Sequence, residues 1–233
     1  TDIVLAGGAG EITGGSGNVT FKDSSGSISI GLEGGAGTIS LADSDLDEIT
    51  TSGAIIIGDA SSGAVTIGGA IQPSGSEAIQ FSGSSVALNA NVTTANADIT
   101  FVPAVTVGAD VTIDSGAGVG DITFSSQLVV NGILRGSTSA EELGASMTVS
   151  PGGRVIGDIR APIVLIHGRV DGTVYALEHL EIAEGAVIQG DLHYNVLQMH
   201  MGASVQGRLI HSVPEKLVSV EERKVEGIGL VKE

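Results

Sequence analysis

Five histidines lie in the second half of the chain, and imidazole is the side chain best suited to bind a transition metal. They are His167, His179, His193, His200 and His211. A fold that stacks successive segments would bring His193 and His211 near one another. However, the chain has no cysteine, and no two histidines have the short spacing of a zinc motif. We therefore interpret the histidines as outward-facing surface residues and expect neither a metal site nor a cofactor.

Carboxylates are the other groups that could do chemistry. Residues 43–48 read DSDLDE, but they lack the glycine at position six and the glutamate at position twelve of a calcium-binding loop, which favours a solvated acidic loop. Asp158, Asp171 and Asp191 recur along the second half, and stacked carboxylates on a β-helix could hydrolyse a polysaccharide. These three flank repeat glycines in differing registers, without an aligned basic partner or an aromatic platform for a sugar. We therefore predict that the protein is not an enzyme.

The elements that carry these residues must have an unusual core. Gly is abundant at 36 residues and aromatic content is only 3%, yet hydrophobic residues make up 42% of the chain. Small and β-branched aliphatic side chains must therefore fill the interior. Such side chains pack well on the pleated surface of β-strands. The composition favours an all-β fold of many short strands.

Charge excludes some partners and divides the chain. The net charge of −17 argues against binding nucleic acid or an anionic membrane surface. No apolar run reaches 18 residues, so we expect no membrane-spanning helix. Residues 1–126 contain one basic and fourteen acidic residues, whereas residues 127–233 contain nine and thirteen. We place a domain boundary near residue 125 and predict that the charge-rich tail, 213–233, is disordered.

A five-residue repeat, apolar–x–Gly–x–apolar, organises the second half. Its copies are 130–134, 155–159, 170–174, 188–192 and 205–209, with glycine spacings of 25, 15, 18 and 17. Alternating apolar pairs precede the last four copies and indicate further strands. An inserted surface loop over 137–146 would explain the long first spacing. A single repeat of this length cannot bury its own apolar face, so the copies must stack. Stacking would place Ile159, Val174, Leu192 and Leu209 in one interior column.

The first half carries a looser repeat of about 20 residues. Its copies are an aliphatic residue, a polar residue and an aromatic or aliphatic residue at 19–21, 39–41, 79–81, 99–101 and 122–124. Glycines and small polar residues separate these strands, as tight corners require. The two halves therefore predict one parallel β-solenoid, a rod of stacked coils, that continues through the boundary.

The last coil of such a rod exposes unpaired strand edges and apolar side chains. No obvious capping segment follows residue 210, so this end is the predicted site of self-association. The residues that we expect to form the contact are Leu197, Met199, Val205, Leu209 and Ile210.

The second half also resembles a known family, the bactofilins. The segments that carry the resemblance are GRVIGDIRAP at 153–162, HGRVDGTVYA at 167–176, GAVIQGDLHY at 185–194 and GASVQGR at 202–208. The resemblance implies a right-handed parallel β-helix over 125–212. It also implies a cytoplasmic scaffold that polymerises end to end into cytoskeletal filaments without nucleotide. If a fusion on the N-terminal side blocks one end, we expect a tail-to-tail dimer instead.

Residues 1–124 are similar to a different family, the β-helical shafts of filamentous-haemagglutinin-like secreted adhesins. GAVTI at 63–67 and ADITF at 97–101 carry this looser resemblance. It implies an alternative function, a segment of an extracellular surface fibre. A secreted shaft joined to a cytoskeletal core is an uncommon pairing, so an engineered fusion of two solenoids is a further alternative.

Overall fold

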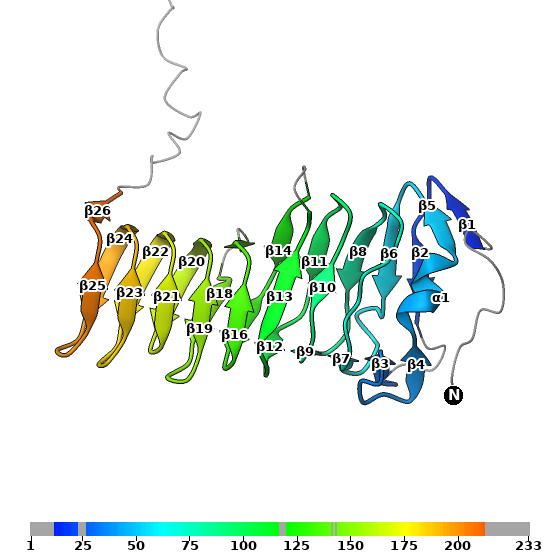
Figure 1. Ribbon diagram of the computed structural model, residues 1–233, viewed down its shortest axis with the longest axis horizontal. Coiled ribbons are helices and arrows are strands. Elements are labelled where there is room, and N and C mark those ends of the chain that lie inside the picture. The colour runs from blue at the N-terminus through cyan, green and yellow to red at the C-terminus, as the bar shows by residue number, and fades with distance from the viewer. Residues whose placement is uncertain (1–11, 23–26, 117–119, 141, 143, 213–233) are drawn as a thin grey trace, which may run out of the picture.

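The chain forms an elongated rod of stacked coils, seen from the side in Figure 1. The structure, a computed structural model, describes residues 12–22, 27–116, 120–140, 142 and 144–212. Strands in this part of the chain pair in parallel, each with the strand one coil before it and one coil after it. The pairings cross residue 125 without interruption, since Ile99 aligns with Ile122 and Val105 aligns with Leu128. The predicted all-β parallel solenoid, continuous through both halves, is confirmed.

Three sets of strands make the sides of the rod, which we call faces A, B and C. Face A contains β2 (Val19–Phe21), β6 (Ala54–Ile57), β8 (Ala78–Phe81), β11 (Ile99–Phe101), β14 (Ile122–Phe124), β17 (Thr138–Ser139), the first parts of β20 (Ile159–Ile166), β22 (Val174–Ile182) and β24 (Leu192–Met199), and then β26 (Leu209–His211). Face B contains β4 (Ile39–Leu41), β3 (Ile30–Leu32), β7 (Val65–Ile67), β9 (Val86–Leu88), β12 (Val105–Val107), β15 (Gln127–Val130), β18 (Ser146–Val149) and the second parts of β20, β22 and β24. Face C is a separate 7-stranded sheet of β10 (Val92–Thr93), β13 (Val111–Asp114), β16 (Ile133–Arg135), β19 (Arg154–Ile156), β21 (Arg169–Asp171), β23 (Val187–Gln189) and β25 (Ser204–Gln206).

Columns of aliphatic side chains run lengthwise through the interior. Ile159, Val174, Leu192 and Leu209 align on successive strands of face A, as the sequence predicted. The first three of these side chains are fully buried, because the coils on either side cover them. Period-two alternation places every second residue of a strand in the column, so its neighbours face outward.

Glycine is required at the corner between faces C and A. Gly190 has φ +151°, a conformation that is largely restricted to glycine. A Cβ atom there would also collide with the carbonyl oxygen of Gly172, one coil earlier. Gly157 is constrained in the same way: its φ is +147°, and a Cβ atom there would collide with the carbonyl oxygen of Gly136. The coils therefore approach each other closely at this corner, backbone against backbone.

One repeat copy was placed in the wrong register. The repeat pattern predicts 130–134 as the first copy, equivalent to 155–159. In the structure, however, Leu134 pairs with Val155, so the corner glycine equivalent to Gly157 is Gly136. The pattern at 130–134 lies at a different corner of the rod, where the residue types are similar. The predicted loop over 137–146 was also too long, because Thr138 and Ser139 form β17.

The side chains of one interior column change from aromatic to small where the two halves meet. The rings of Phe81, Phe101 and Phe124 stack along the axis, with centroids 5.0 and 4.9 Å apart, and all three are buried. Continuing this column along face A leads to the buried side chains of Ala161 and Ala176. The column therefore holds phenyl rings up to Phe124 and methyl groups at Ala161 and Ala176, before it reaches the partly buried ring of Tyr194 in the next coil.

Two expectations for the N-terminal region were wrong. Ile39–Leu41 does not continue the 20-residue column of face A, because it pairs with β3 on face B. Residues 43–48 are not a solvated loop: Asp43–Asp47 form α1, and the side chains of Asp45 and Leu46 are buried. The Asp45 carboxylate accepts a hydrogen bond of 2.7 Å from the backbone N–H of Ala42, which stabilises the first turn of the helix.

The segment from β4 through α1 to β5 (Ile49–Thr51) lies at the N-terminal end of the rod (Figure 1). There β5 pairs with β1 (Ile12–Gly15) in a small sheet of its own. Leu41, Leu46 and Ile49 join the core, each no more than 2% exposed. This end of the solenoid therefore carries a covering segment. The predicted disordered tail, 213–233, lies outside the described residues.

Candidate self-association surface

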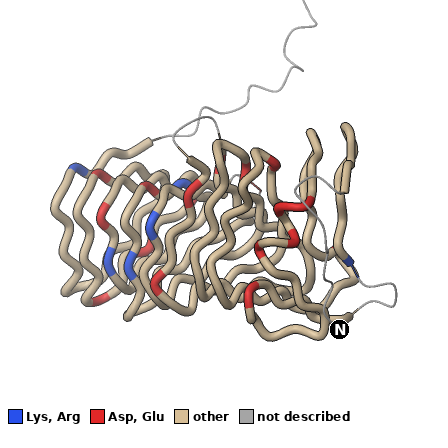
Figure 2. The backbone as a smooth tube through the Cα atoms, turned by 45° about the vertical axis from the view of Figure 1, so that its right-hand side comes forward, with Lys and Arg blue, Asp and Glu red and all other residues tan. Residues whose placement is uncertain are grey.

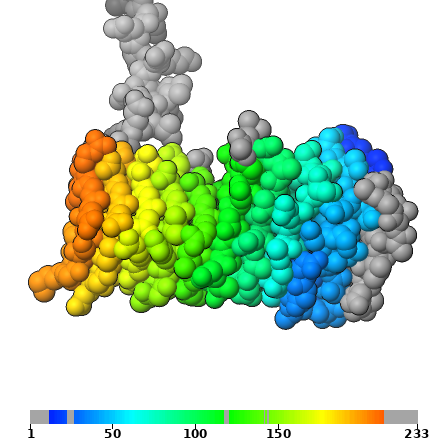
Figure 3. Space-filling model, viewed as in Figure 1, coloured from blue at the N-terminus to red at the C-terminus, as the bar shows by residue number. Residues whose placement is uncertain are grey.

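The opposite end of the rod is formed by the last coil, from the second part of β24 through β25 to β26, and is the orange end in Figure 3. The inward columns stop here. Leu197 and Met199 end the columns of face B, Val205 ends that of face C, and Leu209 ends that of face A. Each of these residues pairs with the preceding coil, but among the described residues no further strand pairs on the other side. We call the last coil, residues 196–211, the end surface.

Large hydrophobic side chains are exposed at this end. Of the six that are exposed in the described part of the chain, four belong to the last coil: Val196 at 52%, Met199 at 46%, Met201 at 93% and Leu209 at 46%. Elsewhere on the rod, aliphatic side chains of the same columns are buried by a neighbouring coil. An apolar patch of this kind typically marks an interaction site.

Unpaired backbone accompanies the apolar side chains. β24 pairs over its whole length with β22, but on its other side only residues Leu192, His193 and Tyr194 pair with β26. Within the described residues, the stretch 196–199 therefore presents backbone N–H and C=O groups without a strand partner. Such an edge is a template for another strand.

The structure brings the five predicted residues together in or beneath the last coil. Leu197, Met199, Val205 and Leu209 occupy inward positions, whereas Ile210 follows His193 in an outward column of face A. Sequence reasoning missed Val196 and Met201, because neither belongs to an inward column. Met201 lies in the turn after β24, and Val196 faces outward beside the corner of the coil. Their apolar character at the last repeat was the only available signal.

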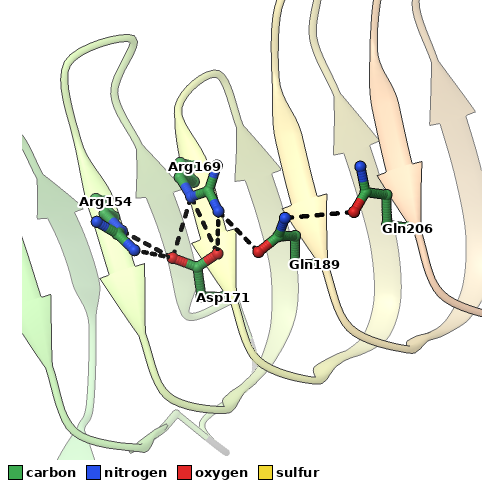
Figure 4. A network of polar contacts seen from close by, with 5 residues as sticks. All are labelled: Arg154, Arg169, Asp171, Gln189 and Gln206. Carbon is green, nitrogen blue, oxygen red and sulfur yellow. Dashed lines mark hydrogen bonds and ion pairs between the residues drawn. The ribbon is translucent and has the colours of Figure 1, made fainter.

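A polar network runs along face C toward the end surface (Figure 4). The Asp171 carboxylate accepts hydrogen bonds from Nε of Arg154 at 2.7 Å and from Nε of Arg169 at 3.0 Å. The guanidinium of Arg169 also donates to Oε1 of Gln189 at 2.8 Å, and Nε2 of Gln189 donates to Oε1 of Gln206 at 3.3 Å. The hydrogen bond from Arg169, followed by that from Arg154, lowers the pKa of Asp171. The network links the middle of the domain to its last coil.

A second ion pair ties the last corner to the coil beneath it. Nε of Arg208 donates to Oδ2 of Asp191 at 3.0 Å, and the backbone N–H of Arg208 donates to Oδ1 of Asp191 at 2.9 Å. These contacts lower the pKa of Asp191 and raise that of Arg208. The expectation that these aspartates lack basic partners was therefore wrong. The arginines lie one coil away, which local sequence patterns do not reveal.

These carboxylates do not form an acid–base pair. Asp171 and Asp191 are held by arginines, and Oδ1 of Asp158 accepts a hydrogen bond of 2.7 Å from the backbone N–H of Thr173. Asp158 and Thr173 lie at the same corner as Asp191, whereas Asp171 lies on face C. All three link one coil to the next. Basic residues gather on the same half of the rod, as Figure 2 shows.

The histidines occupy separate surface positions in the second half. The ring of His193 stacks on Tyr175 with centroids 4.6 Å apart, and that of His211 tilts against Tyr194. Nε2 of His200 lies 3.3 Å from a carboxylate oxygen of Glu181. His193 and His211 fall in neighbouring columns, so they do not pair directly. In the described ranges, no three His, Asp or Glu side chains are grouped to hold a metal ion.

The described residues form a parallel β-solenoid, a repeat fold in which each coil contacts only its neighbours. Residues 106–210 match the family model of bactofilins, described as polymer-forming cytoskeletal proteins. Over 110 residues, 47% of this chain, the sequence is 29% identical to "Bactofilin BacO" of Myxococcus xanthus (strain DK1622), covering 81% of that protein. The similarity to bactofilins therefore covers the second half of the rod, residues 106–210.

The match begins at Thr106, upstream of the boundary predicted near residue 125. No solved structure gives a significant match to the chain. Among the described residues, no helix is long and apolar enough to cross a membrane.

Proposed function

We propose that this protein is a non-enzymatic cytoskeletal scaffold of the cytoplasm whose copies associate with one another through the end surface. The family description, polymer-forming cytoskeletal, supports the class of function. The observation that carries the mechanism is the exposure of Val196, Met199, Met201 and Leu209 on the last coil, beside an unpaired strand edge. A second copy would cover both.

The free energy for this association comes from burial of apolar surface and from pairing of backbone groups. About 25 cal/mol is gained for each Å² of apolar surface removed from water. Neither contribution requires hydrolysis of a nucleotide. We therefore propose that assembly is independent of nucleotide and is governed by protein concentration.

The two ends of the rod differ, and this difference sets the form of the assembly. The N-terminal end carries β4 and α1, with Leu41 and Leu46 buried, whereas the last coil exposes its apolar side chains. If only one end associates, two molecules meet end surface to end surface and the assembly stops at a dimer. A long filament would need the N-terminal end to associate as well.

Substitution of Leu209 by Asp tests the proposal. We expect the unmodified protein to sediment as a dimer or larger assembly whose size depends on concentration, and Leu209→Asp to sediment as a monomer, because a charge would be buried without a partner. Val102→Asp is the matched control. Val102 is 42% exposed, close to the 46% of Leu209, but lies outside the last coil.

Electron microscopy of the same samples separates short paired rods from long filaments. The proposal fails if the unmodified protein remains a monomer at high concentration. It also fails if Leu209→Asp and Val102→Asp sediment alike.

A further inference from the structure

The protein contains few sulfur atoms, and most of the exposed sulfur lies at one end of the rod. The chain has three methionines and no cysteine. Met147 is 2% exposed and lies in the core of face B, where its sulfur is 3.7 Å from the Thr138 hydroxyl that donates to it. Met199 and Met201 are 46% and 93% exposed. An oxidant in solution therefore meets two thioethers on the surface, and both belong to the end surface.

The two exposed methionines both belong to the proposed contact. Met199 ends the inward column that runs through Ile166 and Ile182, so a copy docking on the end would cover its side chain. Met201 projects from the turn between β24 and β25, within two residues of Met199. Unbranched thioethers fit irregular apolar contacts well, which suits both positions to an association surface.

We propose that Met199 and Met201 are oxidation sites for hydrogen peroxide and that their conversion to methionine sulfoxide weakens association through the end surface. The inference rests on the proposed function of the end surface. In the reaction, a sulfur lone pair attacks one peroxide oxygen, the O–O bond breaks and an S–O bond forms. After proton transfer, the second oxygen leaves as water. Each sulfur is oxidised by two electrons, and the peroxide is reduced to water.

Sulfoxide formation changes the end surface from apolar to polar. The sulfoxide oxygen is a hydrogen-bond acceptor that water satisfies at the free end, but an apolar contact would bury it without a donor. The free energy of the separated state is thereby lowered relative to the assembled state. Two such groups at each end weaken association by at least about tenfold, the factor that corresponds to 1.4 kcal/mol.

Association should in turn slow the oxidation of the two methionines. In an assembly, the docked copy shields Met199 and Met201 from peroxide, so these sites should oxidise more slowly as protein concentration rises. Met147 is covered by its own coils at every concentration and serves as an internal reference. Methionine sulfoxide is returned to methionine by sulfoxide reductases, so the change is reversible.

The test uses the full chain treated with hydrogen peroxide, with peptide mass spectrometry of all three methionines and sedimentation velocity before and after treatment. We expect Met201 and Met199 to oxidise at least about tenfold faster than Met147 in dilute protein. We also expect the association constant to fall at least about tenfold and to recover after treatment with sulfoxide reductases. Whatever association constant the variant Met199→Leu/Met201→Leu shows before treatment, peroxide should leave that constant unchanged, because the variant lacks both exposed thioethers.

Two results overturn the inference. One is oxidation of Met147 as fast as that of the exposed pair. The other is unchanged association after both exposed methionines are fully oxidised, which refutes this inference alone and leaves the proposed function standing. If the untreated protein does not associate, the proposed function fails and this inference fails with it.

Discussion

Substituting Gly190 by Ala tests whether the corner glycines fix the spacing of the coils. Gly190 has φ +151°, and a new Cβ would lie 2.6 Å from the carbonyl carbon of Gly172 and closer still to its oxygen. A backbone held in a glycine-only region costs a non-glycine residue about 1–3 kcal/mol. Overpacking against immobile backbone adds about 1–3 kcal/mol. We expect the free energy of unfolding to fall by about 2–6 kcal/mol.

For a protein of this size, each kcal/mol shifts Tm by about 2–4 °C, so Gly190→Ala should lower Tm by about 4–24 °C. Thermal unfolding followed by far-UV circular dichroism measures the shift. Gly152→Ala is the matched control, because the nearest atom to its new Cβ, apart from its chain neighbours, is the carbonyl oxygen of Asn131 at 3.8 Å. The control should be neutral or slightly stabilising, since alanine reduces the freedom of the unfolded chain. Equal Tm values for the two variants would refute the reasoning.

Two further substitutions probe the core and the polar network. Phe101→Ala should lower the free energy of unfolding by about 3–5 kcal/mol, because the ring is fully buried between Phe81 and Phe124, and the midpoint of urea unfolding measures the loss. A loss below about 1 kcal/mol would show that the stack can collapse into the space. Asp171→Asn should cost no more than about 1 kcal/mol near neutral pH, because the arginines that hold Asp171 are partly exposed.

The pH dependence of the Asp171 contribution has a definite sign. The arginines lower the pKa of Asp171 in the folded protein, so its stabilisation is present above the unfolded pKa of about 3.9 and is lost as pH falls through the lower, folded value. Titration of Tm from neutral pH to acid should show a steeper decline for the unmodified protein than for Asp171→Asn. Parallel curves for the two proteins would contradict this assignment.

The interior columns could be predicted because the chemistry that forms them is local. Alternation of apolar and polar residues sets the face of each strand, and a corner glycine marks where the strand ends, so the alignment of Val174, Leu192 and Leu209 follows from spacing alone. The same reasoning failed at 130–134, because glycines occupy two corners of each coil with similar neighbours. The register between coils decides whether a glycine lies at the corner between faces B and C or at the corner between faces C and A, and local sequence patterns do not reveal that register.

Features that depend on contacts between coils escaped prediction. The ion pair of Arg154 with Asp171 joins residues 17 positions apart on adjacent strands. Helix α1 has only five residues, which is too short to show a helical periodicity in the sequence. Its first turn depends on the hydrogen bond to the Asp45 side chain. For the end surface, the inward residues were predicted from their columns. Met201 and Val196 become recognisable only when their exposure in the folded coil is known.

The change from stacked phenyl rings to Ala161 and Ala176 along one column limits how such a rod can evolve. Duplicating the coil of Phe101 would add a phenyl ring to the stack, and duplicating the coil of Ala161 would add a methyl group beside Ala176. Transplanting a coil across the junction would force a phenyl ring into a space fitted to a methyl group, or leave a void where a ring belongs. Lengthening of the rod is therefore expected to have proceeded separately on each side of the junction, with the transition coil inherited as a fixed adaptor.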